Sequence, residues 1–110
     1  MNQGEIWLTD LEPVKGSEQG KVRPVVIISG DTLNTNLPIV IACPLSSVLK
    51  NYETCVVLKK SPENGLSSDS EIISFQIRTL SKQRLIKKLG KITKFQLDQV
   101  IAGINDVLKY

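Results

Sequence analysis

Val25-Val26-Ile27-Ile28 decides the fold, because four consecutive β-branched residues are typical of a strand that is covered on both faces. The chain enters this strand through the polar segment Lys15-Gly16-Ser17-Glu18-Gln19-Gly20-Lys21-Val22-Arg23-Pro24. Gly16 and Gly20 allow this segment backbone conformations that other residues avoid. The sequence therefore predicts a polar loop held by a rigid strand.

This loop carries several side chains that can contact a phosphate or a base edge: Lys15, Glu18, Gln19, Lys21 and Arg23. Functional residues are often placed on loops that a scaffold positions. A charged, glycine-bearing loop between two strands can equally be a solvated connection. The residue pattern alone leaves both interpretations open.

Together with this strand, at residues 25–29, short strands are expected at residues 5–9, 39–43, 54–58, 73–78 and 86–92. We expect the strand at 39–43 to end at Pro44, which cannot donate to a ladder, and residues 30–38 to form turns and connections. Alternation over 73–78 predicts Ile73, Phe75 and Ile77 in the core. Gln76 and Arg78 then lie on the polar face, which either is solvated or faces a ligand. Residues 81–85 can form one helical turn.

The clearest helix begins after Thr93. Thr93 and Gln96 have the spacing of a capping box, and Ile92 with Leu97 has the spacing of a hydrophobic staple. Apolar residues then recur every three or four positions and form one stripe: Leu97, Val100, Ile101, Ile104 and Leu108. Many short strands followed by one helix predict an α+β fold, a bent antiparallel sheet or small barrel with the C-terminal helix packed on it, in a single domain over residues 1–110.

Composition excludes several classes of protein. The chain has 110 residues and no histidine, so neither a Ser-His-Asp triad nor a histidine-pair ribonuclease mechanism is possible. Cys43 and Cys55 cannot complete a zinc site alone, and we expect them to be reduced core residues. No apolar run reaches the length of a membrane span, and Met1–Glu5 does not resemble a secretory signal. We therefore expect a soluble cytoplasmic protein without metal or other cofactor; its net charge of +3 mildly favours a polyanionic partner.

Several motifs occur in an order that resembles the MazF/PemK family of toxin endoribonucleases. The opening is Gly4-Glu5-Ile6-Trp7, Glu12-Pro13, Lys15 to Gly20, and Arg23 to Ser29. The later motifs are Cys43-Pro44-Leu45-Ser46-Ser47, Gly65-Leu66, Asp69-Ser70, Gln76-Ile77-Arg78-Thr79-Leu80 and Lys82-Gln83-Arg84-Leu85. The resemblance covers nearly the whole chain and is weakest between Gly30 and Pro38.

The resemblance implies an SH3-like barrel, as in CcdB, and a metal-independent endoribonuclease acting on single-stranded RNA through the 2′-hydroxyl. It implies that Arg23 and Ser46 are the catalytic pair, with serine where the family more often has threonine. Asp69-Ser70 stands where some relatives have aspartate followed by glutamine, so that glutamine's base contact does not transfer. The residues expected to contact RNA are Lys15, Glu18, Gln19, Lys21, Ser47, Asp69, Gln76 and Arg78. The resemblance also implies a homodimer and an acidic, MazE-like antitoxin.

Two other functions are compatible with such a barrel. One is a non-enzymatic toxin that inhibits DNA gyrase by protein contact, and the other is a barrel that binds RNA without cutting it. Arg23 and Ser46 favour the nuclease, because a guanidinium offers paired donors to phosphate and a hydroxyl can orient it. The proton acceptor is open among Glu18, a water molecule and a perturbed Arg23, since an ordinary guanidinium is a poor base.

Overall fold

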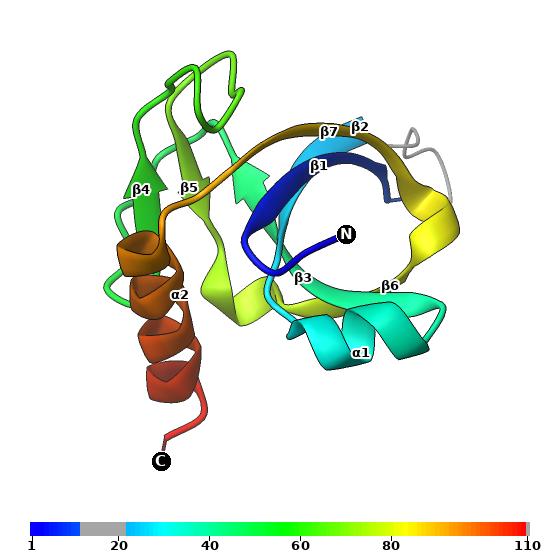
Figure 1. Ribbon diagram of the computed structural model, residues 1–110. Helices are drawn as coiled ribbons and strands as arrows, with labels where there is room; N and C mark the ends of the chain where they lie inside the picture. The colour runs from blue at the N-terminus through cyan, green and yellow to red at the C-terminus, as the bar shows by residue number, and fades with distance from the viewer. Residues whose placement is uncertain (12–21, 110) are drawn as a thin grey trace, which may run out of the picture.

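The computed structural model describes residues 1–11 and 22–109, which form an antiparallel β structure with a C-terminal helix (Figure 1). Lys15, Glu18, Gln19 and Lys21 lie outside the described residues. The elements are β1 Glu5–Asp10, β2 Val22–Ile27, α1 Asp31–Asn36, β3 Ile39–Ser46, β4 Val56–Leu58, β5 Ser70–Ile72, η1 Ser74–Gln76, β6 Arg78–Ser81, η2 Lys82–Arg84, β7 Leu85–Lys91 and α2 Lys94–Val107.

The sheet has β3 at its centre and runs in the order β4-β5-β3-β2-β1-β7, with all its described pairings antiparallel. Along one edge β3 changes partner: Ile39–Ala42 pair with β6, and Leu45 and Ser46 pair with β5. The sheet curls strongly, so that β1, β2, β3, β6 and β7 form a half-barrel beside β4, β5 and α2 (Figure 1). The α+β class and the curled antiparallel sheet expected from the sequence are confirmed.

The apolar run at residues 25–28 is covered on both faces, as predicted. Val26 and Ile28 belong to the larger core cluster, which includes Leu97 and Val100 of α2. Val25 and Ile27 belong to a second cluster inside the curl, against which Trp7 packs. Because successive residues of a strand point to opposite faces, this run joins the two cores.

Helix α2 begins where the sequence indicated. The Thr93 hydroxyl accepts a hydrogen bond from Gln96 N at 3.1 Å, and Thr93 N donates to Gln96 Oε1 at 2.9 Å, which completes the capping box. Leu97 and Val100 are buried against the sheet. The predicted packing of the C-terminal helix on the sheet is confirmed.

The expected strand at residues 73–78 is wrong. Ser74–Gln76 instead form a 3₁₀ turn, so the two-residue alternation is interrupted and Ser74 is the buried side chain. Phe75 and Ile77, expected in the core, are 44% and 39% exposed. The Ser74 hydroxyl donates to Thr54 Oγ1 at 3.1 Å, a tertiary bond that periodicity does not reveal. Arg78 begins β6 rather than ending a strand.

Other boundaries also differ from expectation. β3 continues through Pro44 to Ser46, because Pro44 lies where this edge of β3 passes from β6 to β5 and its carbonyl accepts from Ile73 N at 3.0 Å. The strand expected at 54–58 shortens to β4, and β5 was not expected. Residues 31–36, expected as turn and connection, form α1, whose buried Asn34 donates to Ser29 O at 2.9 Å. Six residues are too few for a helical apolar pattern.

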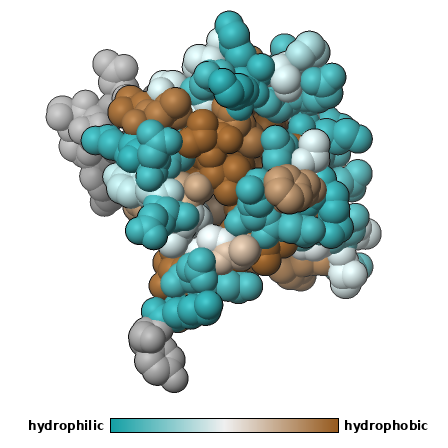
Figure 2. Space-filling model, turned by 90° about the vertical axis from the view of Figure 1, so that its left-hand side faces the viewer, coloured by the Kyte–Doolittle hydropathy of each residue, from teal (hydrophilic) through white to brown (hydrophobic). Residues whose placement is uncertain are grey.

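No helix in the described ranges is long and apolar enough to cross a membrane. Figure 2 shows apolar side chains gathered on the side of the molecule that carries β4 and α2, with hydrophilic residues around them. Exposed large apolar residues of these two elements are Val57, Phe95 and Val107. Exposed apolar surface of this kind is common where proteins contact a partner.

Candidate active site

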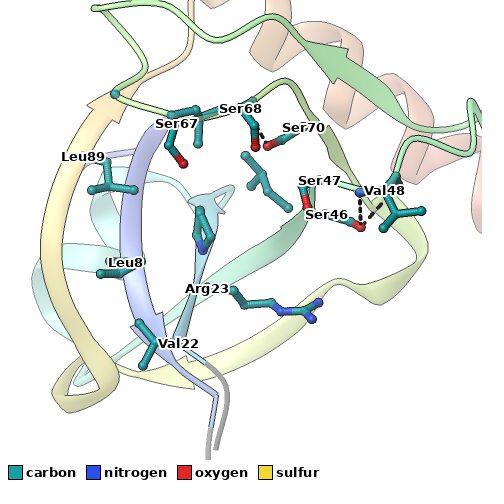
Figure 3. Close-up of a pocket in the computed structure, with 14 residues that line it drawn as sticks. Leu8, Val22, Arg23, Ser46, Ser47, Val48, Ser67, Ser68, Ser70 and Leu89 are labelled. Atoms are coloured by element: carbon teal, nitrogen blue, oxygen red, sulfur yellow. Dashed lines mark hydrogen bonds between the residues drawn. The ribbon is translucent and has the colours of Figure 1, made fainter.

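A cleft of about 640 Å³ opens between β2, the end of β3 and the segment before β5 (Figure 3). Its floor and sides are largely aliphatic, and its rim is rich in serine. The described lining consists of Leu8, Val22, Arg23, Pro24, Leu45, Ser46, Ser47, Val48, Gly65, Leu66, Ser67, Ser68, Ser70 and Leu89. Within this set Arg23 is the one charged residue.

Arg23 is positioned by the start of β2. It is half-buried and lies opposite Thr9 of β1, while the Val25–Pro44 pair joins β2 to β3. The β2–β3 ladder ends at the Val25–Pro44 pair, and Arg23 and Ser46 each lie two residues beyond it on the same side. Figure 3 shows the Arg23 side chain extending toward the side of the cleft where Ser46 and Ser47 lie. Among the described residues its guanidinium has no hydrogen-bond or ion-pair partner.

Ser46 ends β3, and its hydroxyl is bonded to the loop that follows. Ser46 Oγ accepts from Val48 N at 3.1 Å and donates to Val48 O at 3.3 Å. This local turn holds the hydroxyl at the mouth of the cleft, next to the exposed Ser47 (Figure 3). The Ser46 hydroxyl is turned toward Val48, and both serines line the same cleft as Arg23 (Figure 3).

The opposite wall is a loop closed by glycine contacts. Gly65 has φ +68°, a conformation that favours glycine, and a Cβ added at Gly90 would lie 2.3 Å from Glu63 O. The Asn64 side chain accepts from Ser61 N and Leu66 N, each at 3.0 Å, and donates to Lys59 O. The wall is therefore fixed before any ligand binds. It presents the hydroxyls of Ser67 and Ser68, which the sequence reasoning did not single out.

Comparison with known proteins assigns the chain to a family. Residues 2–108 match the model of the PemK-like, MazF-like toxins of type II toxin-antitoxin systems. The chain belongs to this family. It is 42% identical over 107 residues to Endoribonuclease MazF of Staphylococcus saprophyticus, an alignment that covers 96% of this chain and 88% of that protein.

Solved structures agree with the assignment of this MazF-like toxin. MazF (Form-I) from Deinococcus radiodurans superposes with a TM-score of 0.81 at 25% identity, covering 98% of this chain and 96% of that one. A MazE-MazF structure (Form-II) from the same organism gives 0.83 at 25% identity, covering 98% and 95%. These relatives do not favour the gyrase-inhibitor alternative.

The fold of this MazF-like toxin brings together Arg23, Ser46 and Ser47, but not every residue expected to contact RNA. Asp69 is exposed and accepts a hydrogen bond from Lys60 N at 2.8 Å, outside the described lining. Gln76 and Arg78 are exposed on η1 and β6, also outside that lining. Ser70, at the position where some relatives have glutamine, is buried and donates to Ser68 O at 3.0 Å.

Two buried ionisable groups have shifted pKa values. Burial raises the pKa of Glu5. Hydrogen bonds from the Trp7 indole and the Asn2 backbone, together with the contact with Lys88, outweigh this effect, so the pKa lies below its ordinary value. The Trp7 Nε1–Glu5 Oε1 distance is 2.9 Å, and Lys88 Nζ is 3.1 Å from Glu5 Oε2. Burial raises the pKa of the Cys43 thiol to about 12, as befits the core role expected for it.

Proposed function

We propose that the cleft is the catalytic centre of an endoribonuclease, in which Arg23 and Ser46 act on one phosphodiester of single-stranded RNA. The observation that carries the proposal is the position of Arg23, the one charged residue in the described lining, on the strand next to the Ser46 hydroxyl. The 42% identity to a protein named an endoribonuclease supports the same reaction. A single strand suits an open cleft because its bases can leave the stack and contact side chains.

In the proposed reaction the 2′-hydroxyl oxygen attacks the adjacent phosphorus, and the bond from phosphorus to the 5′-oxygen breaks. The products are a 2′,3′-cyclic phosphate and a 5′-hydroxyl. The Arg23 guanidinium pairs with two phosphate oxygens and stabilises the charge that develops on them. The Ser46 hydroxyl donates to the same phosphate and holds it in line. The described lining contains no carboxylate, so the proton of the nucleophile passes to solvent or to Glu18, which lies outside the described residues. The 5′-oxygen takes up a proton from solvent as it leaves.

The remaining lining suits the nucleotides on either side of that phosphate. Aliphatic side chains such as Leu8, Leu66 and Leu89 offer a surface for a base, and the hydroxyls of Ser47 and Ser67 can bond to its edge. Lys15, Glu18, Gln19 and Lys21 are proposed to contact the RNA from their loop. Asp69, Gln76 and Arg78 stay proposals for RNA beyond the cleft.

We further propose a toxin role in the cytoplasm, opposed by an acidic antitoxin. A relative of this fold was solved as a MazE-MazF complex. A net charge of +3 suits an acidic, partly disordered partner that folds on binding. The exposed apolar side chains of β4 and α2 suit burial against protein, which is consistent with the proposed homodimer or with the antitoxin.

The test is an incubation of the purified protein with a long single-stranded RNA in excess chelator. We expect discrete cuts with 5′-hydroxyl and cyclic phosphate ends. The chelator should not prevent them, because the proposed reaction uses the Arg23 guanidinium and the Ser46 hydroxyl and no metal ion. A matched RNA with one deoxyribose at the cut position should resist, since it lacks the nucleophile. Cleavage of the deoxyribose substrate would refute the 2′-hydroxyl mechanism. Intact RNA together with inhibited DNA gyrase would replace the nuclease with the binding toxin.

A further inference from the structure

A buried carboxylate lies directly behind the catalytic rim. Glu71 is the central residue of β5, has no exposed surface, and is the ladder partner of Ser46. It is not part of the described cleft lining. A carboxylate is an unusual occupant for such a position, where an apolar β-branched residue would fit the strand and the core better.

Three consecutive backbone amides compensate this buried charge. Glu71 Oε1 accepts from Lys50 N at 2.7 Å and from Asn51 N at 3.1 Å, and Glu71 Oε2 accepts from Tyr52 N at 2.9 Å. Asn51 has φ +56°, in the left-handed region, a conformation that turns successive amides toward one anion. The ion pairs of the described residues do not include Glu71, so within this part of the chain its charge is compensated by the three amides.

The loop at residues 47–52 in turn depends on Glu71 for its position. Residues 47–52 contain no helix or strand, so no regular ladder holds them. Hydrogen bonds to a charged acceptor are about twice as strong as neutral ones, and here they fix the far end of the loop. The near end is the turn in which Val48 bonds to the Ser46 hydroxyl. Glu71 and Ser46 thus fasten the two ends of one short loop.

We propose that Glu71 is a positioning residue for catalysis: it holds the loop after β3 so that the Ser46 hydroxyl and Ser47 face the phosphate bound by Arg23. The inference rests on the proposed function of the cleft. Loss of the carboxylate frees three amides and lets the loop shift, which moves the Ser46 hydroxyl. Glu71 itself does not contact the substrate in this proposal. A misplacement of about 1 Å is enough to lower the rate about 100-fold.

The test is a double-mutant cycle in the full chain, with Glu71→Gln and Ser46→Ala. Glutamine keeps the shape of Glu71, but its amide nitrogen must face at least one backbone N–H. We expect Glu71→Gln to lower the single-turnover cleavage rate at saturating protein by about 10- to 100-fold. Affinity for an uncleavable RNA with deoxyribose at the cut site should stay within about threefold. In the Ser46→Ala background the same change should cost less than about threefold, because the group being positioned is already absent.

A purely structural role predicts a different pattern. Val100→Ala, in the core under α2, serves as a control that lowers the melting temperature without reaching the cleft. It should cleave at the wild-type rate at temperatures well below its melting point. The positioning role is refuted if Glu71→Gln also cleaves at the wild-type rate. It is equally refuted if Glu71→Gln lowers the cleavage rate by the same factor whether Ser46 is present or replaced by alanine.

Amide exchange separates this inference from the proposed function. The amides of Lys50, Asn51 and Tyr52 should be protected in the wild type and should exchange faster in Glu71→Gln, while the Val100→Ala variant keeps them protected locally. If the wild type does not cut RNA, the proposed function fails although the exchange result stands. If the wild type cuts RNA and these amides are unaffected in Glu71→Gln, the positioning role alone fails.

Discussion

Arg23→Ala should remove most of the cleavage activity and leave the fold intact. In the proposal Arg23 makes two parallel charge-assisted hydrogen bonds to phosphate, each of which contributes about 1.5–3 kcal/mol. Their loss in the transition state amounts to about 3–6 kcal/mol, or roughly 10²- to 10⁴-fold in rate at about 1.36 kcal/mol per tenfold. Arg23→Lys keeps the charge but only one such bond, so we expect a loss of about 10- to 100-fold.

The fold should tolerate both changes, because Arg23 is half-buried and its guanidinium has no bonding partner among the described residues. The free energy of unfolding should change by less than about 0.5 kcal/mol, measured by urea denaturation. Rates are measured in single turnover with protein in excess over a short single-stranded RNA. Lys94→Ala, which removes an exposed cation on α2, is the matched control and should cleave normally. Wild-type cleavage by a folded Arg23→Ala variant refutes the catalytic assignment.

Ser46→Ala should lower the cleavage rate by about 100-fold, whereas Ser46→Thr should stay active because the hydroxyl is kept. Equal single-turnover rates for the Ser46→Ala and Ser46→Thr variants would contradict the assignment. Gly90→Ala should lower the free energy of unfolding by about 1–3 kcal/mol, because its Cβ would lie 2.3 Å from Glu63 O; an unchanged denaturation midpoint would show that the cleft wall yields. Glu5 has a lowered pKa, so its contribution to stability is present above its ordinary value near 4.5 and is lost as pH falls through the lower folded value. Melting temperatures of Glu5→Gln should therefore fall less steeply in acid than those of the wild type. Light scattering should show a dimer, and an acidic antitoxin peptide should compete with RNA more weakly as salt rises; a monomeric active enzyme or simultaneous binding would contradict these two expectations.

Features set by local chemistry could be predicted from the sequence. The doubly covered strand at 25–28 follows from four consecutive apolar β-branched residues, and the start of α2 follows from the Thr93–Gln96 capping box. In both cases neighbouring residues in the chain carry enough of the information. Arg23 and Ser46 were identified through the resemblance to the toxin family, and the structure places both in the lining of one cleft.

Features set by contacts between distant segments could not be predicted. The 3₁₀ turn at Ser74–Gln76 depends on a bond from Ser74 to Thr54, and the continuation of β3 past Pro44 depends on where the strand changes partner. Glu71 appears in the sequence as an ordinary charged residue, yet it is fully buried because amides some 20 positions earlier surround it. No periodicity records such a partnership.

The change of partner along β3 has a consequence for how the molecule opens. Within β3, Ile39–Ala42 pair with β6 and Ala42–Pro44 pair with β2, whereas Leu45 and Ser46 are joined to β5 by a two-residue ladder, and β4 and β5 have three residues each. Short ladders break in local fluctuations that longer ones survive. We therefore expect the end of β3 that carries Ser46, the proposed catalytic serine, to open more often than the part of the strand paired with β2 and β6. Glu71 opposes this opening, because it pairs with Ser46 through β5 and binds the three amides of residues 50–52 through its side chain.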